Sequence, residues 1–110
     1  MLKVQPARIL RIHISESDRY RGTPLFEAII AKCRELQIAG ATVFQGLEGF
    51  GESAELHRAH LLRHDFPIVI AIVDTAEKLD RLLPAVEAMI GTGVLATSEV
   101  EMIRVEKPAR

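Results

Sequence analysis

Cysteine and net charge are both scarce in this sequence. Cys33 is the one cysteine among 110 residues, which excludes an intramolecular disulfide framework and fits a reducing compartment. The formal net charge is -1, so the overall charge gives no reason to expect a nucleic-acid or membrane partner. The apolar runs are too short to span a membrane, and Arg8, Arg11 and His13 interrupt the first of them, unlike the core of a signal peptide. We therefore expect a cytoplasmic protein.

The length and the apolar content point to one folded unit. A chain of 110 residues can bury a single hydrophobic core, and 48% hydrophobic with 26% charged residues is typical of a globular protein. We expect one domain over residues 1–110, with its core over about residues 8–105.

Four segments have the patterns of strands. Apolar and polar residues alternate over residues 8–14 and 100–105, which predicts strands with one buried face. Residues 39–51 begin with β-prone residues, and the β-branched run at 66–74 predicts a central strand that is buried on both faces.

Two segments have apolar residues at helical spacing. The first helix is predicted to start from an N-cap at Thr23 with Pro24 in the first helical position, and to end at Gly40. The second is predicted to start from an N-cap at Asp74, and Pro84 is expected to kink or split it.

The predicted order is therefore β-α-β-β-α-β. Two right-handed crossover units of this kind form a ferredoxin-like α+β sandwich, with a four-stranded antiparallel sheet and both helices on one face. Ile9, Phe44 and alternate residues of the 66–74 strand would then place apolar side chains on the uncovered face. The simplest partner for that face is a second copy of the chain, so we expect a closed homo-oligomer.

Glycines cluster where the second predicted strand ends. Gly46, Gly49 and Gly51 surround the large aromatic residue Phe50, and a connection of about fourteen residues, roughly 52–65, follows. Connections of that length without regular structure are often functional. Glycines at the loop base would let backbone N–H groups approach an anion, and the alternative is a hairpin tip without a function.

Four blocks of the sequence form a recognisable set: Glu16-Ser17-Asp18, Gly22-Thr23-Pro24-Leu25, Gly40-Ala41-Thr42-Val43 and Gly49-Phe50-Gly51. Together they resemble the PII-like family catalogued as domain of unknown function 190 (DUF190), over about residues 8–105. The resemblance implies a homotrimer with its sheets facing inward and a long loop, the T-loop, between the second and third strands. It also implies kinship with PII signal proteins, which bind adenine nucleotides in clefts between subunits and act on partner proteins through the T-loop.

The resemblance also assigns candidate effector-binding residues. A Gly-Phe-Gly stands at the T-loop base of PII proteins, and a Thr-Gly begins their second nucleotide-binding element, after the second helix. Arg104 and Lys107 are basic residues that could reach a cleft from the C-terminal end. The matching residues are Gly49, Phe50 and Gly51 for the first element, and Thr92 and Gly93 for the second.

Two departures from the PII pattern concern the phosphates. Glu52 stands where PII proteins typically have a basic residue, and "VLATSEVE" after Gly93 replaces a lysine-containing run. A carboxylate beside a triphosphate is repulsive unless a metal bridges them. We therefore expect a smaller adenine nucleotide or another anionic effector, and not ATP bound through its phosphates as in PII proteins.

Three histidines suggest a different ligand. His57, His60 and His64 would project from one face of a helix and could bind zinc or copper, with a carboxylate such as Asp65 completing the site. The alternative function is thus a divalent-metal-binding trimer similar to the CutA-type proteins. A ligand-free interaction module and a histidine-rich loop without metal also remain open.

The sequence offers little for catalysis. Ser15, Ser17 and Asp18 are close in sequence to His13, but a catalytic triad is defined by geometry. We expect Glu16 and Asp18 to order the loop before the first helix by accepting backbone hydrogen bonds. Cys33 lies in a predicted helix stripe and is expected to be a core residue. We predict a regulatory protein, not an enzyme, with an unidentified protein target for residues 52–65.

Overall fold

The computed structural model describes residues 2–50 and 65–108. Within these ranges the order of the main elements is β-α-β-β-α-β, as predicted, with one extra short hairpin before the first helix. The main strands are β1 (Leu2–Ser15), β4 (Gly40–Gln45), β5 (Pro67–Asp74) and β6 (Val94–Val105), the hairpin is formed by β2 (Arg19–Tyr20) and β3 (Thr23–Pro24), and the helices are α1 (Leu25–Glu35) and α3 (Ala76–Met89).

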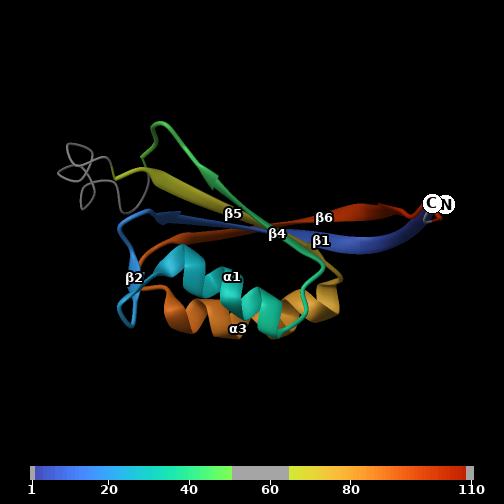
Figure 1. Cartoon of the computed structure of the whole chain (residues 1–110), viewed down its shortest axis with the longest axis horizontal. Helices are drawn as coiled ribbons and strands as arrows, with labels where there is room; N and C mark the ends of the chain where they lie inside the picture. The colour runs from blue at the N-terminus through green and yellow to red at the C-terminus, as the bar shows by residue number, and fades with distance from the viewer. Residues whose placement is uncertain (1, 51–64, 109–110) are drawn as a thin grey trace.

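The four long strands form one sheet in the order β4-β5-β1-β6, and each neighbouring pair is antiparallel. The helices α1 and α3 pack on each other and lie together against one face of the sheet (Figure 1). The predicted ferredoxin-like α+β fold is therefore confirmed. No helix in the described ranges is both long and apolar enough to cross a membrane.

The hydrophobic core lies between the two central strands and the two helices. Because side chains alternate along a strand, every second residue of β1 and β5 points toward the helices. The opposite side of β5 is only half-buried, so the prediction that this strand is buried on both faces is wrong for the single chain. The core residues are Leu10, Ile12 and Ile14 of β1, Ile68, Ile70 and Ile72 of β5, Leu25, Ile29 and Cys33 of α1, and Leu79, Leu82 and Val86 of α3.

The uncovered side of the sheet, called the open face below, has the apolar residues that the alternation predicts. Ile9 lies opposite Val73, and both Phe44 and His13 lie opposite Val69, so these side chains share one face. Of this set, Phe44 is 55% exposed.

The first helix begins and ends at other residues than predicted. Its N-cap is Pro24, no side chain caps it, and Thr23 is instead paired in the β2–β3 hairpin. The first helical N–H, of Leu25, donates to the carbonyl of Asp18 at 2.8 Å. The helix ends before Gly40, because Gln37 adopts a left-handed backbone conformation with φ 55°.

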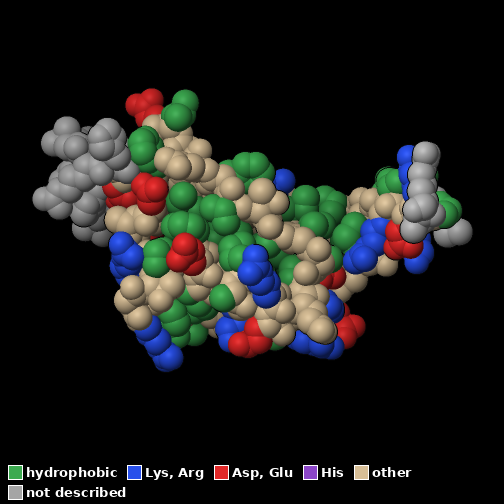
Figure 2. All heavy atoms as spheres, viewed as in Figure 1, with side chains coloured by type: hydrophobic (Ala, Val, Ile, Leu, Met, Phe, Trp, Pro, Cys, Tyr) green, Lys and Arg blue, Asp and Glu red, His purple; other side chains and the backbone are tan. Residues whose placement is uncertain are grey.

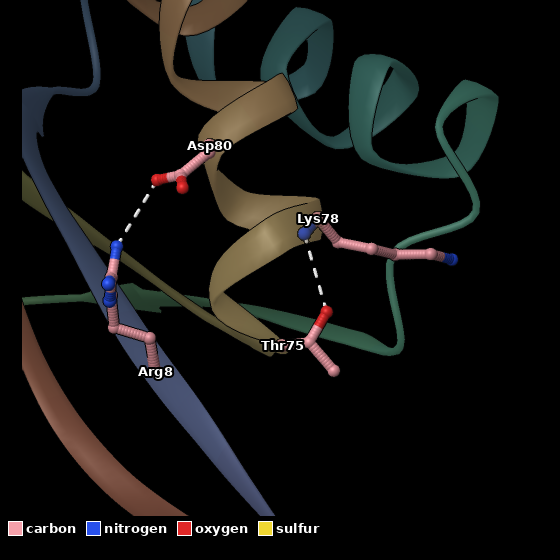
Figure 3. A network of polar contacts seen from close by, with 4 residues as sticks. All are labelled: Arg8, Thr75, Lys78 and Asp80. Atoms are coloured by element: carbon pink, nitrogen blue, oxygen red, sulfur yellow. Dashed lines mark hydrogen bonds and ion pairs between the residues drawn. The ribbon is translucent and has the colours of Figure 1, made fainter.

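The N-cap of α3 is Thr75, and the predicted cap at Asp74 is wrong. The Thr75 hydroxyl accepts a hydrogen bond from the Lys78 N–H at 3.3 Å (Figure 3). The Asp74 carboxylate instead accepts from the N–H groups of Ala39, at 2.8 Å, and Thr75, at 2.7 Å. Asp74 thereby ties the segment before β4 to the start of α3.

An ion pair joins α3 to the sheet. Arg8 of β1 forms an ion pair with Asp80 of α3, with 3.2 Å between guanidinium and carboxylate (Figure 3).

Pro84 lies inside the helix, which is continuous from Ala76 to Met89, so the predicted split does not occur. Pro84 and Asp80 are both exposed, and water can therefore hydrate the carbonyl that lacks a helical N–H partner.

The outer halves of β1 and β6 extend beyond the predicted strands. β5 pairs with β1 only from Arg8 onward, whereas β6 pairs with β1 from Leu2 to His13. Residues 2–7 and 100–105 therefore form a two-stranded projection, called the β1–β6 ribbon below, which reaches past the helices (Figure 1). These additional strand residues have weak local signals, because Pro6 ends the short alternation that begins at Leu2 and residues 94–99 do not alternate.

Candidate functional site

The base of the long connection is built around Pro67. The Gly46 N–H donates to the Pro67 carbonyl at 2.8 Å, directly after β4 ends at Gln45. A Cβ atom on Gly46 would lie 2.9 Å from the Pro67 Cγ, and one on Gly49 would lie 3.4 Å from it. Gly46 therefore permits a close approach of the two segments, which is one of the roles that glycine has at a strand end.

Two large apolar side chains at this base face solvent. Leu47 is 89% exposed and Phe50 is 96% exposed. Side chains this exposed are free to contact a ligand or another chain. Gly51, the last residue of the Gly-Phe-Gly candidate, lies outside the described residues.

The other end of the connection is anchored by the buried carboxylate of Asp65. One carboxylate oxygen accepts from the Ser15 hydroxyl at 2.7 Å and from the Ser17 N–H at 2.9 Å, and the other accepts from the Ser17 hydroxyl at 2.8 Å. Asp65 is 6% exposed. The neighbouring N–H of Glu16 donates to the Phe66 carbonyl at 2.9 Å, so the end of β1 holds both residues that precede β5.

This anchor was not identified from the sequence. Ser15 and Asp65 are fifty positions apart in the sequence. No local pattern signals such a pairing, because it depends on the register between β1 and β5. Of the two carboxylates expected to accept backbone hydrogen bonds here, Asp18 does so, from the Ser15 N–H at 2.8 Å.

The second candidate element lies between α3 and β6. Thr92 is exposed, and Gly93 packs tightly against β1. A Cβ atom on Gly93 would lie 2.9 Å from the carbonyl oxygen of His13 and 3.3 Å from the Ile14 side chain. A larger residue at position 93 would therefore force β6 away from β1.

The two candidate elements lie at the same end of the sheet but on opposite edges. Gln45, the last residue of β4, pairs with Ile68 of β5, while Val94, the first residue of β6, pairs with His13 of β1. Three strand spacings separate β4 from β6. At about 4.8 Å per spacing the two edge strands are about 14 Å apart. One chain therefore presents two separated halves of the candidate site.

Arg104 does not join either half within one chain. It pairs with Lys3 in the β1–β6 ribbon, eleven residues after Gly93 along an extended segment. At about 3.3 Å per residue the separation is roughly 36 Å.

The metal hypothesis concerns residues that the structure does not describe. His57, His60 and His64 all lie outside the described residues. Within residues 2–50 and 65–108, no cluster of three or more His, Cys, Asp or Glu side chains is arranged to hold a metal ion. His13 is exposed on the open face, opposite Val69 and Val94.

Cys33 is a core residue, as predicted. Its side chain is 3% exposed on the inner face of α1. Burial raises the pKa of the Cys33 thiol from 9.0 to about 11, because the thiolate would lose its hydration. The thiol therefore stays protonated at neutral pH and is a poor nucleophile.

Solved structures share this fold. CPII, a nitrogen regulatory PII-like protein from Thiomonas intermedia K12, matches with a TM-score of 0.64 and 17% identity in a structure bound to ADP, AMP and bicarbonate. The match covers 91% of this chain and 98% of that one. The apo form of CPII matches with a TM-score of 0.61 and 20% identity, over 96% of this chain and 100% of that one. At these identities the likeness concerns the fold.

Sequence comparison identifies the family. A UPF0166 protein from Aquifex aeolicus is 31% identical over 104 residues, which are 93% of this chain and 98% of that protein. The model of the DUF190 family, described as "Uncharacterized ACR, COG1993", matches residues 7–102. This range includes all of the main strands except the outer ends of the β1–β6 ribbon. The chain therefore belongs to the DUF190 family.

Proposed function

We propose that this chain is a PII-like regulatory protein that binds a small adenine nucleotide, or a related anionic effector, between the subunits of a homotrimer. The effector contacts the Gly49–Gly51 base of one subunit and the Thr92–Gly93 turn of the next. Residues 52–65 transmit its presence to a protein partner, and no catalytic step is involved.

The observation that carries this proposal is the division of the candidate site. The loop base and the Thr92–Gly93 turn lie at the same end of the sheet, on the edge strands β4 and β6. In one chain the two halves are separated by about 14 Å across the sheet, so they do not form the two walls of one pocket. When edges of neighbouring copies meet, the half from one copy faces the half from the next.

Both ends of the long connection are fixed at the proposed site. Gly46 is held to Pro67 at one end, and Asp65 is held to Ser15 and Ser17 at the other. An effector at this base can favour one arrangement of the connection only if it contacts that arrangement more strongly than others. Anchored ends make such a response local to the residues between them.

The choice of an adenine nucleotide is supported by the structural neighbours. CPII has been solved with ADP and AMP together with bicarbonate, and in a second structure with ADP, AMP and acetate. The Glu52 carboxylate and the absence of a lysine after Gly93 in the 94–101 segment favour a ligand with fewer phosphates than ATP.

Thermal unfolding with AMP, ADP and ATP tests the proposal. A ligand that binds only the folded state, at a hundred times its dissociation constant, adds about 2.7 kcal/mol to the free energy of unfolding. We expect AMP or ADP to raise the unfolding midpoint by several degrees, and ATP to raise it less. Zinc and copper in the same panel test the alternative metal site.

Substitution of Thr92 locates the binding site. Thr92→Val removes a hydroxyl from the proposed site, and Thr97→Val makes the same change on β6 at an exposed position outside it. We expect the first variant to weaken nucleotide affinity about tenfold and the second to leave it unchanged. Absence of nucleotide binding by calorimetry in the wild-type protein would overturn the proposal.

A further inference from the structure

The β1–β6 ribbon presents one apolar face that is exposed among the described residues of its own chain. Leu2 lies opposite Val105 and Val4 lies opposite Ile103, so the four side chains share one face. They are 65%, 61%, 54% and 53% exposed, respectively. Figure 2 shows hydrophobic side chains at the surface of this narrow projection, which extends past the helices.

A ribbon of this kind needs further contacts in water. Two antiparallel strands alone are only marginally stable, because a single pair buries little apolar surface. The ribbon begins where β5 stops pairing with β1, at Arg8, and none of its residues belongs to the core cluster. An uncovered apolar ribbon therefore indicates an interaction surface.

The ribbon is suited to contact through its face and less through its edge. Pro6 lies in the β1 half, and a proline in a paired strand must turn its nitrogen toward the unpaired edge because it has no N–H to donate. Addition of another strand along β1 would therefore lack a hydrogen bond at this position.

The open face of the sheet is a complementary surface on the same chain. It contains Phe44 and Val94, 55% and 41% exposed, together with the half-buried Ile9, Val69 and Val73. β1 and β6 run without interruption from sheet to ribbon. The apolar ribbon face consequently continues the helix-covered side of the sheet and cannot fold back onto the open face of its own chain.

Charge also matches between these two surfaces. Glu101 shares the apolar ribbon face through its pairing with Pro6, and Arg11 lies on the open face opposite Ala71. In one chain the two side chains are on opposite faces and five pairing positions apart, about 17 Å along the strands. They can meet only between two copies.

We propose that the apolar face of the β1–β6 ribbon packs on the open sheet face of a second copy of this chain, with Glu101 beside Arg11 of that copy. The contact is heterologous, so each copy gives its ribbon to one neighbour and receives a ribbon from the other. The inference gives an interface to the homotrimer on which the proposed function rests.

Two variants in adjacent positions test the role of the ribbon face. Val4→Glu places a carboxylate on the apolar face, and Gln5→Glu places the same group on the opposite face of the same strand. In sedimentation equilibrium we expect the first to raise the dissociation constant of the oligomer at least about tenfold, and the second to change it less than about threefold. Circular dichroism verifies that both variants are folded.

Charge exchange tests the partner surface, and the double variant separates loss of the contact from a folding defect in either single variant. Glu101→Arg and Arg11→Glu should each weaken association, and the double variant should recover most of the loss, because the pair is re-formed with its signs reversed. Equal association of Val4→Glu and wild type, independence of the two charge changes, or a wild-type monomer at micromolar concentration would each overturn the inference.

These outcomes are separable from those of the nucleotide proposal. An oligomer whose dissociation constant is unchanged by the ribbon variants but which binds ADP would overturn the ribbon contact and leave the proposed function unaffected. An oligomer that dissociates with Val4→Glu but binds no nucleotide would do the reverse.

Discussion

The Ser15 hydroxyl donates a 2.7 Å hydrogen bond to the buried carboxylate of Asp65, which lies fifty residues further along the chain. This contact joins the end of β1 to the end of the long connection. A second pair of bonds, from the N–H and hydroxyl of Ser17, completes the anchor. The start and the end of the connection are thereby held at one end of the sheet, which is where the proposed effector site lies.

Removal of the Asp65 carboxylate should destabilise the protein. Asp65→Ala leaves the buried Ser15 hydroxyl without this acceptor, and an unsatisfied buried polar group costs about 1–3 kcal/mol. Urea denaturation of Asp65→Ala should show this loss. Ser17→Ala, at an exposed position, should cost about 1 kcal/mol or less. An Asp65→Ala variant as stable as the wild type would show that the anchor contributes nothing.

Gly93 and Gly91 should respond differently to the same substitution. Gly93→Ala would bring a Cβ atom to 2.9 Å from the His13 carbonyl oxygen, and that backbone atom cannot move without disturbing the sheet. We expect a loss of about 1–3 kcal/mol in the free energy of unfolding. Gly91→Ala meets no atom within 4 Å and should change stability by less than about 1 kcal/mol. Chemical denaturation of both variants would reveal whether the close approach of β6 to β1 is real.

The stability of the helix start should depend on Thr75. Thr75→Ala removes the hydroxyl that accepts from the Lys78 N–H and should cost about 1 kcal/mol. Thr23→Ala is the matched control, because Thr23 precedes α1 without capping it, and we expect a cost below about 0.5 kcal/mol. The midpoints of urea unfolding measure both. The reverse order of the two losses would favour the cap positions expected from the sequence.

Stability should fall at alkaline pH because of Cys33. The pKa of about 11 in the folded state lies above 9.0, the ordinary pKa of the thiol, which applies in the unfolded state. Between pH 9 and pH 11 the unfolded thiol therefore loses its proton while the folded thiol keeps it. The folded state then binds more protons, and the free energy of unfolding falls by up to about 1.4 kcal/mol per pH unit. The stabilisation that comes from the raised thiol pKa is complete below pH 9 and is lost as the pH approaches 11.

Comparison with Cys33→Ala isolates that contribution. The variant has the same other titrating groups, so the difference between the two stability curves reports the thiol alone. We expect the difference to be constant below pH 9 and to shrink above it in urea titrations between pH 7 and 11. Parallel curves over the whole range would contradict a raised pKa.

The strands and helices were predictable from the sequence because their signals are local. Alternation along residues 8–14 and the β-branched run at 66–74 give a period of two, and the helix stripes give a period near 3.6. The predicted order of elements then leaves few topologies, and the ferredoxin-like sandwich is the one observed. The open face and its apolar residues followed from the same alternation.

The helix ends depended on tertiary contacts. Thr23 and Asp74 each have a side chain suited to an N-cap, yet Thr23 is paired in a hairpin and the Asp74 carboxylate accepts from the Ala39 N–H. A neighbouring element can take a capping side chain for another bond, and the local sequence does not contain that neighbour. The candidate glycines were identifiable from spacing and family resemblance, but their separation on two edges of the sheet was not.

By itself, the sequence determined the order of the elements, the faces they bury and the glycines at the base of the long connection, because each depends on residues within a few positions of one another. The tertiary structure alone decided that Asp65 meets Ser15, that the two halves of the candidate site lie on opposite edges, and that β1 and β6 continue into an uncovered ribbon. These features follow from strand register between distant segments. Register is set by the packing of the whole sheet, which no single segment of the sequence encodes.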